Sequence, residues 1–179
     1  MKSVVFFCLT ISSLAAFSLI VPQKTFAGFL FHATRKAAAK SIMREGISPS
    51  KFRPGNRFGK GFYASKRKIT ALKERPKADA LIRLRTSKNL KRRSINLTRP
   101  SKSLLKKLVG AKYDMRGKVK KGVIGPKLGK KLGQVADRRG KAIEFKSSKN
   151  GWTNVFIPKS LFKKHRRIVS PKATSVLKP

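Results

Sequence analysis

The fold is decided by the stretch from residue 30 to residue 65, which opens with LFHATR (30–35) and closes with GNRFGKGFYAS (55–65). The first apolar run, GFLF at 28–31, is typical of a buried strand and ends at His32. The second apolar run carries Tyr63. A helix and a loop separate the two runs, so the chain can turn back and place His32 beside Tyr63.

The helix and the loop between the two runs are both marked in the sequence. Thr34 is suited to cap the helix, and Gly46 is suited to end it in the left-handed conformation. Residues 47–61 contain two prolines and three glycines and are therefore predicted to be a loop. Gly59 and Gly61 carry no Cβ atom and would let the backbone approach a ligand closely.

The composition is strongly basic. The chain has 179 residues, of which 46 are Lys or Arg and only 6 are Asp or Glu, giving a formal net charge of +40. This length suits one domain with a core. The charge favours a polyanionic partner, although a strongly solvated basic surface would give the same composition. Any carboxylate chemistry must use one of six residues, which are Glu45, Glu74, Asp79, Asp114, Asp137 and Glu144.

The first 27 residues have the pattern of a secretory signal peptide. Lys2 is followed by an apolar run over 4–21 and by small residues that end at Ala27, where we expect cleavage. We therefore expect a secreted or periplasmic protein, with an uncleaved membrane anchor as the alternative. No later stretch is apolar enough to span a membrane. Cys8 is the only cysteine and lies inside the apolar run, so the mature chain would have no disulfide.

The remaining pattern predicts an α+β domain over residues 28–162, followed by a basic, flexible tail over 163–179. Its sheet is expected to be small and either mixed or antiparallel. Helices are predicted from Ser65 to Arg75, over 101–109 and over 127–139, and strands over 81–85, 94–97, 141–145 and 153–157.

Three segments together resemble a known family. LFHAT (30–34), IMREGI (42–47) and RFGKGFYAS (57–65) resemble the amino-terminal half of the ADP-ribosyltransferase fold of the His-Tyr-Glu type. In that family a strand histidine is followed two residues later by Thr or Ser, and a Gly-rich approach precedes a strand tyrosine. Residues 141–157 look like the closing strand pair of toxin-like members. The resemblance implies a split sheet and a cleft for NAD+.

The resemblance also implies roles for particular residues. NAD+ is the substrate in this family: nicotinamide leaves, and ADP-ribose passes to an acceptor or to water. Glu144 has the family position of the catalytic carboxylate, which stabilises positive charge on the ribose. The residues implied to bind NAD+ are His32, Ala33, Thr34, Arg57, Gly61, Tyr63 and Ser65. In this scheme His32 donates to a ribose hydroxyl, the Ala33 backbone holds the carboxamide, and Tyr63 stacks on the nicotinamide. Ser65 or Arg57 holds the remaining polar groups and phosphates.

Simpler interpretations exist for the same residues. His32 is also suited to bond the backbone at a strand end, and Tyr63 to be a core residue. Glu144 on an alternating strand is equally suited to pair with a surface lysine. Ser147 is a rival site residue, because a related group of NAD+-destroying toxins depends on an Arg, a Glu and a Ser. In that version Arg57 matters more than His32.

The preferred hypothesis is a secreted, monomeric, toxin-like mono-ADP-ribosyltransferase that uses NAD+ and meets a polyanion, such as a nucleic acid, or an acidic protein as acceptor. One alternative is a non-enzymatic basic protein that keeps the fold and binds polyanions. Another is an NAD+-degrading glycohydrolase toxin. A zinc site or a Cys-His nucleophile is not expected, because the mature chain has no cysteine and only His32 and His165 as histidines.

Overall fold

The computed structural model describes residues 26–53, 57–112, 114, 118–148, 151–165 and 167–176. The predicted signal peptide lies outside this part of the chain except for its last two residues. Those two belong to the first strand, which begins at Phe26, so cleavage after Ala27 would shorten this strand. Within the described ranges no helix has both the length and the apolar character needed to cross a membrane.

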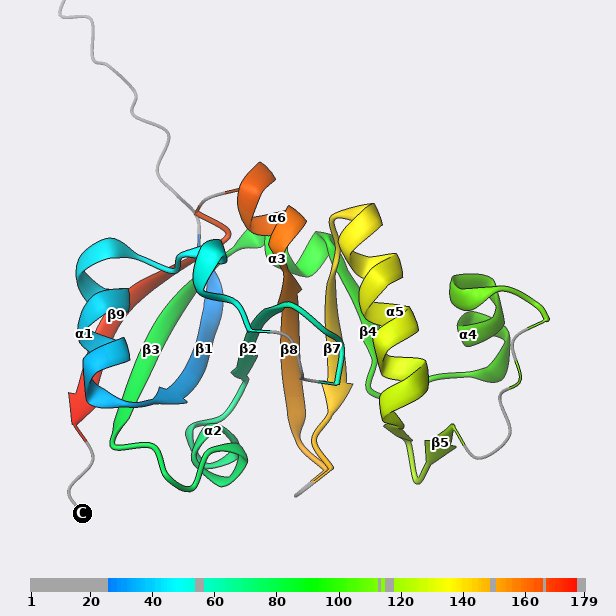
Figure 1. The fold of residues 1–179 in the computed structure, drawn as a ribbon, viewed down its shortest axis with the longest axis horizontal. Helices are drawn as coiled ribbons and strands as arrows, with labels where there is room; N and C mark the ends of the chain where they lie inside the picture. The colour runs from blue at the N-terminus through cyan, green and yellow to red at the C-terminus, as the bar shows by residue number, and fades with distance from the viewer. Residues whose placement is uncertain are drawn as a thin grey trace, which may run out of the picture.

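The architecture is α+β, as the sequence predicts (Figure 1). Seven strands form one mixed sheet in the order β4-β7-β8-β2-β1-β3-β9. They are β1 (Phe26–Thr34), β2 (Gly61–Ser65), β3 (Ala80–Ser87), β4 (Ser94–Leu97), β7 (Ala142–Lys146), β8 (Thr153–Pro158) and β9 (Val169–Val176). β5 (Val119–Lys120) and β6 (Val123–Ile124) form a separate short hairpin.

The helices lie around this sheet. They are α1 (Lys36–Glu45), the 3-10 turn η1 (Pro49–Lys51), α2 (Lys68–Glu74), α3 (Lys88–Arg92), α4 (Lys102–Val109), α5 (Pro126–Arg139) and α6 (Lys159–Lys164). α5 runs alongside β7, and α1 lies near β3 and β9 at the other end of the molecule (Figure 1).

The sheet consists of two well-paired halves that barely join. One half contains β1, β3 and β9, and the other contains β2, β8, β7 and β4. All pairs are antiparallel except β4 with β7. β1 and β2 share one registered pair, Phe31 with Ser65, whereas β1 pairs with β3 from Phe26 to Thr34. The backbone ladder therefore stops between the halves, and the sheet opens there.

Each face of the sheet has its own core. On one face Phe62, Ile82 and Ile157 belong to a buried cluster that α1 and α6 cover. On the other face a second cluster includes Phe156 and the buried side chains of α4 and α5. Because side chains alternate along a strand, neighbours such as Phe156 and Ile157 serve different cores. The apolar strands thus hold two layers of helices.

α5 contains two glycines that receive the loop before β2. A Cβ atom at Gly133 would lie 1.7 Å from the carbonyl oxygen of Phe58, and one at Gly129 would lie 2.7 Å from that of Arg57. These distances are shorter than any van der Waals contact, so only glycine lets the loop backbone lie directly on the helix. The four-residue glycine spacing in this helix is therefore a packing feature.

Some sequence expectations need correction. The flexible tail predicted from residue 163 is wrong in its described part: α6 ends at Lys164, and β9 pairs with β3 along its length. Polar composition hid this strand, because its outer side chains face solvent while buried Ile168 and Val169 anchor its start. The helix predicted from Ser65 begins instead at Lys68, since Ser65 is the last residue of β2.

Candidate active site

A cleft of about 1130 Å³ opens where the two half-sheets separate. Its walls come from β1, α1, η1, the loop before β2, β2 itself and the end of α2. All seven residues predicted to bind NAD+ line it: His32, Ala33, Thr34, Arg57, Gly61, Tyr63 and Ser65. The structure therefore brings these residues together, although their roles in binding stay a prediction.

His32 joins the two halves beyond the end of the backbone ladder. Its Nδ1 lies 2.8 Å from the carbonyl oxygen of Tyr63, which can only accept, so Nδ1 carries the hydrogen. The His32 ring also contacts the Phe62 ring, with centroids 4.5 Å apart. The side chain thus takes the place of a backbone N–H of β1. The backbone role considered for this histidine is real, and it coexists with a position on the cleft wall.

The environment keeps His32 neutral. Burial is the largest cause that lowers its pKa, to about 4, and the charge of Arg75 acts in the same direction. The hydrogen bond to Tyr63 opposes both effects without overcoming them. At neutral pH Nε2 therefore has a lone pair and accepts hydrogen bonds. A neutral ring that donates from Nδ1 has no second donor, so the donor role that the resemblance implies for His32 would require a protonated ring.

Tyr63 lines the cleft and is tied to the fold by both its hydroxyl and its ring. The hydroxyl accepts from the N–H of Phe58 at 2.8 Å and donates to the carbonyl of Gly59 at 3.4 Å. Its ring packs on Phe156, with centroids 5.0 Å apart. Burial raises the pKa of Tyr63, so the phenol stays protonated. The core role considered for Tyr63 is thus present, in a residue that also lines the cleft.

Glu74, at the end of α2, is the one acidic residue among the described residues that line the cleft. The Ser147 hydroxyl and the Asn154 amide both donate to its Oε1, the latter at 3.1 Å. Asn154 in turn accepts from the Ser65 hydroxyl at 2.5 Å. Ser65, Ser147 and Asn154 are all buried. The Glu74 network, as we call these four residues, fixes a carboxylate at the cleft with buried hydrogen bonds.

The turn after β7 holds Ser147 in this network. The Ser147 N–H donates to the carbonyl of Trp152 at 2.7 Å, and its carbonyl accepts from Gly151 at 3.1 Å. The strand pair β7–β8 therefore delivers Ser147 and Asn154 to the same carboxylate. Ser147 was the rival to Glu144 in the sequence, and the structure connects it to Glu74.

Glu144 lies elsewhere. It is on β7 between Ile143 and Phe145, and its carboxylate pairs with Lys66, Nζ to Oε2 2.5 Å. Its neighbour Phe145 lines the cleft. Glu144 is not among the cleft residues. Its predicted catalytic role is untested, but its position matches the alternative of a lysine-paired strand residue.

The cleft is rich in cations. Its Lys and Arg residues are Arg35, Lys51, Arg53, Arg57 and Arg75. The guanidinium of Arg57 lies 5.8 Å from the Phe145 ring and donates to the carbonyl of Lys146 at 3.4 Å. Five cations around one carboxylate make this cleft suited to an anionic ligand, such as one with a diphosphate.

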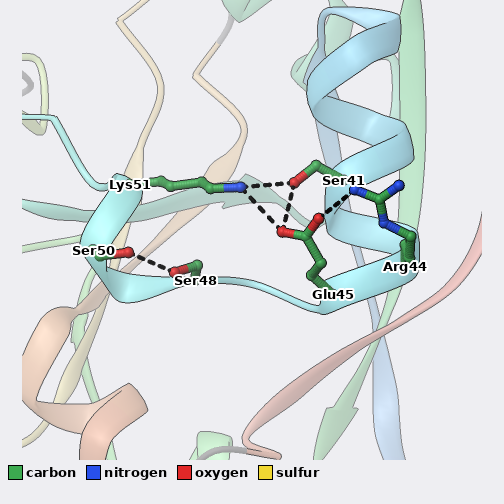
Figure 2. Close-up of polar contacts among 6 residues, drawn as sticks. All are labelled: Ser41, Arg44, Glu45, Ser48, Ser50 and Lys51. Carbon is green, nitrogen blue, oxygen red and sulfur yellow. Dashed lines mark hydrogen bonds and ion pairs between the residues drawn. The ribbon is translucent and has the colours of Figure 1, made fainter.

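One rim of the cleft is a polar clasp between α1 and η1 (Figure 2). Lys51 reaches from η1 to the Ser41 hydroxyl at 2.8 Å and to the Glu45 carboxylate at 3.1 Å. Arg44 binds the other oxygen of Glu45 at 2.6 Å. These partners, Arg44 first, lower the pKa of Glu45 to about 2. The clasp thus pairs Lys51, one of the five cleft cations, with a carboxylate.

Gly61 has a structural reason that differs from the predicted one. A Cβ atom there would lie 2.2 Å from the ring of Phe156 and 2.7 Å from the carbonyl of Ile157. The space is thus filled by β8 rather than left open for a ligand. Gly59 has a φ of +92°, and a Cβ atom there would have nothing within 4 Å, so this glycine suits the turn and leaves room in front of it.

Comparisons with known proteins bear on the fold. No family model and no curated protein sequence matches the chain. Among solved structures, the fold is similar to a chain of the M. tuberculosis MbcT–MbcA toxin–antitoxin complex, with a TM-score of 0.52, 8% identity and 85% of each chain covered. An anti-CRISPR protein matches with a TM-score of 0.44, 17% identity, and coverage of 84% of this chain and 99% of that one.

The first likeness shows a fold shared with a component of a toxin–antitoxin complex, and the split α+β sheet is consistent with the resemblance seen in the sequence. At 8% identity it assigns no residue a role. The Glu74 network is what sequence reasoning missed. Two features of the sequence could have pointed to Glu74. The chain has only six acidic residues, and Glu74 lies near the end of a predicted helix that follows Tyr63 closely in the chain.

Proposed function

We propose that this chain is a toxin-like enzyme that binds NAD+ in the cleft between the two half-sheets and breaks its nicotinamide–ribose bond. The observation that carries the proposal is the cleft itself. It joins His32 and Tyr63, the residues of the family resemblance, with five cations and a carboxylate held by buried donors. The fold shared with a component of a toxin–antitoxin complex supports the toxin-like part.

Each wall of the cleft offers a group for one part of NAD+. The arginines suit the two phosphates, and Arg57 is the one already predicted for that role. His32, neutral and with Nε2 as acceptor, suits a ribose hydroxyl. The ring of Tyr63 offers an aromatic surface for the nicotinamide.

The carboxylate in this proposal is Glu74 rather than Glu144. When the glycosidic bond breaks, positive charge develops on the ribose, and a carboxylate nearby stabilises it. Such a group must face the substrate and be fixed before the reaction. Glu74 meets both conditions, since it lines the cleft and its Oε1 accepts from Ser147 and Asn154. The electron pair of the bond leaves with nicotinamide, and the ribosyl carbon is taken by an acceptor nucleophile or by water.

The test compares the two glutamates. Purified chain is incubated with NAD+, and free nicotinamide is measured for wild type, Glu74→Gln and Glu144→Gln. We expect turnover by wild type, a loss of about 100-fold or more in Glu74→Gln, and a change below about 3-fold in Glu144→Gln. Thermal unfolding of each variant checks that the fold is retained.

The outcomes separate the alternatives. Absence of turnover by wild type would exclude the enzyme hypothesis and favour the alternative of a non-enzymatic basic protein. Loss in Glu144→Gln with retention in Glu74→Gln would restore the catalyst that the sequence predicted. Labelled ADP-ribose distinguishes the two reactions, because transfer attaches the label to an acceptor and hydrolysis releases it free.

A second readout tests the toxin-like part. The chain without its predicted signal peptide is expressed in the cytoplasm of a bacterial host, and growth and the NAD+ pool are followed. We expect growth to stop as NAD+ falls in cells that express wild type, and we expect cells that express Glu74→Gln to grow normally. Growth arrest that persists in Glu74→Gln would point to charge-driven binding instead.

A further inference from the structure

The outer face of the β1, β3 and β9 half-sheet exposes an aromatic ring among cations. Phe29 on β1 is 37% exposed. The guanidinium carbon of Arg83 on β3 lies 3.7 Å from the centroid of its ring, and Nζ of Lys172 on β9 lies 5.4 Å from it. Arg85 is opposite Phe29 in the strand register. We call these four residues the Phe29 face.

Strand geometry places all four side chains on one side of the sheet. Phe29 pairs with Arg85 and Phe31 pairs with Arg83, so Arg83 is the diagonal neighbour of Phe29 on the same face. The register of β3 with β9 shifts between Arg83 and Leu84, and Lys172 is the extra residue at this bulge. A bulge re-aims a side chain, which explains how Lys172 reaches the ring.

On this side of the sheet, α2 covers the end of β1 near Ala33, whereas the end near Phe29 is exposed. α2 packs there through Ala71, which belongs to a small buried cluster with Ala33 and Leu81. Phe29 lies four residues before Ala33 on the same strand. Along this face of β1 the chain therefore changes from an apolar, covered surface to an aromatic and basic, open one.

Five carboxylates of the described residues make contacts away from the Phe29 face. Glu45 pairs with Arg44 and Lys51, and Glu144 pairs with Lys66. Asp79 accepts from the Lys36 N–H at the start of α1. Asp137 accepts from Ser160, and Glu74 belongs to the cleft. Three cationic side chains, Arg83, Arg85 and Lys172, lie on this face, in a chain whose net charge is +40.

We propose that the Phe29 face binds single-stranded nucleic acid, with an unpaired base stacked on Phe29 and phosphates held by Arg83 and Lys172. A part-exposed ring with the Arg83 guanidinium over it and Lys172 nearby supplies the two things such a strand needs: a planar stacking surface, to which ring and guanidinium both contribute, and backbone neutralisation. Duplex bases are already stacked and offer no free face, so the proposal is for unpaired strands. It is independent of NAD+ chemistry and goes beyond it.

The first experiment separates stacking from charge. Full-length chain is titrated with a labelled single strand of about 12 nucleotides, with a duplex of the same length and with heparin, a polyanion without bases. We expect Phe29→Ala to weaken single-strand binding about 10-fold and to leave heparin and duplex binding within about 2-fold of wild type. Phe29→Tyr is expected to restore binding. Ile69→Ala is the matched control, because Ile69 is an exposed apolar residue on α2.

The second experiment tests the cations. Arg83→Gln with Lys172→Gln is expected to lower the slope of log affinity against log salt by about 1.4, or about 0.7 for each phosphate contact on a single strand. Lys102→Gln with Lys106→Gln removes the same charge from α4, at the opposite end of the molecule (Figure 1), and is expected to change the slope much less.

Two results would overturn the proposal. One is single-strand binding that Phe29→Ala leaves unchanged, which would reduce the ring to a partner of Arg83 in the fold. The other is a loss of heparin binding in Phe29→Ala that equals its loss of single-strand binding, because heparin has no bases and such a result would show attraction by charge with no stacked base. Unfolding midpoints close to that of wild type are required for each variant, and Phe29→Tyr keeps the test decisive if Phe29→Ala is destabilised.

Discussion

The two halves of the sheet differ in what holds them, and the junction differs from both. Within each half, backbone hydrogen bonds run along consecutive residues, as between β1 and β3 or between β2 and β8. Between the halves there is one registered pair, Phe31 with Ser65. Beyond that pair a side chain takes over, because His32 donates to the carbonyl of Tyr63. The cleft lies where side chains replace the ladder.

This difference explains why polar groups gather at the junction. A sheet that opens leaves backbone and side-chain polar atoms without strand partners, and buried polar atoms require hydrogen bonds. His32 serves one of them, and the Glu74 network serves the side chains of Ser65 and Asn154. The same opening gives room for a ligand. The candidate site therefore lies at the junction, where the sheet lacks backbone hydrogen bonds between strands.

The largest expected effect comes from protonating His32 at the junction between the two halves. His32 has a pKa of about 4 in the folded chain and about 6.5 when unfolded, so the unfolded state binds more protons between these values. Stability should fall as the pH drops from about 6.5 towards 4, by about 3 kcal/mol in all. Urea unfolding across this range measures it. His32→Gln should lose this part of the pH dependence, and parallel curves for the two proteins would contradict the assignment.

The next largest effect tests the packing of the loop before β2 on α5. Gly133→Ala gains about 1 kcal/mol of helix propensity, but its Cβ would meet the carbonyl of Phe58 at 1.7 Å. Overpacking of this kind costs about 3 kcal/mol, so a net loss of about 2 kcal/mol is expected in denaturant unfolding. Gln134→Ala, an exposed change on the same helix, should stay within about 0.5 kcal/mol. A stable Gly133→Ala would mean that the loop does not rest on α5.

Local patterns predicted much of the fold. The first strand, the helix stopped by Gly46 and the strand pair over 141–157 all follow from apolar runs and breakers, and the structure contains each of them, although β1 runs past His32 to Thr34. β9 was missed because a polar edge strand owes its structure to pairing with β3, a contact between distant segments. α5 was predicted over 127–139, but the fit of its glycines to a loop about 70 residues earlier also depends on a contact between distant segments and could not be predicted.

The candidate site was predicted on one wall only. The residues of the first strand and of β2 could be grouped because their motifs lie close together in the chain. Glu74 could not be grouped with them, since the end of α2 reaches the cleft only through the tertiary fold, whereas Glu144, the predicted carboxylate, pairs with Lys66 and does not line the cleft. The catalytic role of Glu144 stays a prediction. Which face a strand residue takes depends on register, and register depends on partners that the sequence does not name.

A smaller effect concerns the tie between β2 and its preceding loop. Tyr63→Phe removes the acceptor of the Phe58 N–H, which lies 2.8 Å from the hydroxyl, and keeps the ring on Phe156. The loss of one hydrogen bond with its donor part-buried is worth about 1 kcal/mol in urea unfolding. If the ring alone serves the cleft, NAD+ binding by calorimetry should change little. A stability equal to wild type would show that water replaces the hydroxyl at no cost.

The smallest effect is expected inside the well-paired half. Glu144 and Lys66 form an ion pair across strands that backbone bonds already hold, and Lys66 is exposed at 46% of its side chain. Solvent screens such a pair, so Glu144→Gln should cost about 0.5 kcal/mol or less, with a smaller difference at high salt. Lys66→Gln is the reciprocal control and should give the same value. A loss of several kcal/mol, equal in both variants, would show that this half also depends on side chains, and the contrast between halves and junction would fail.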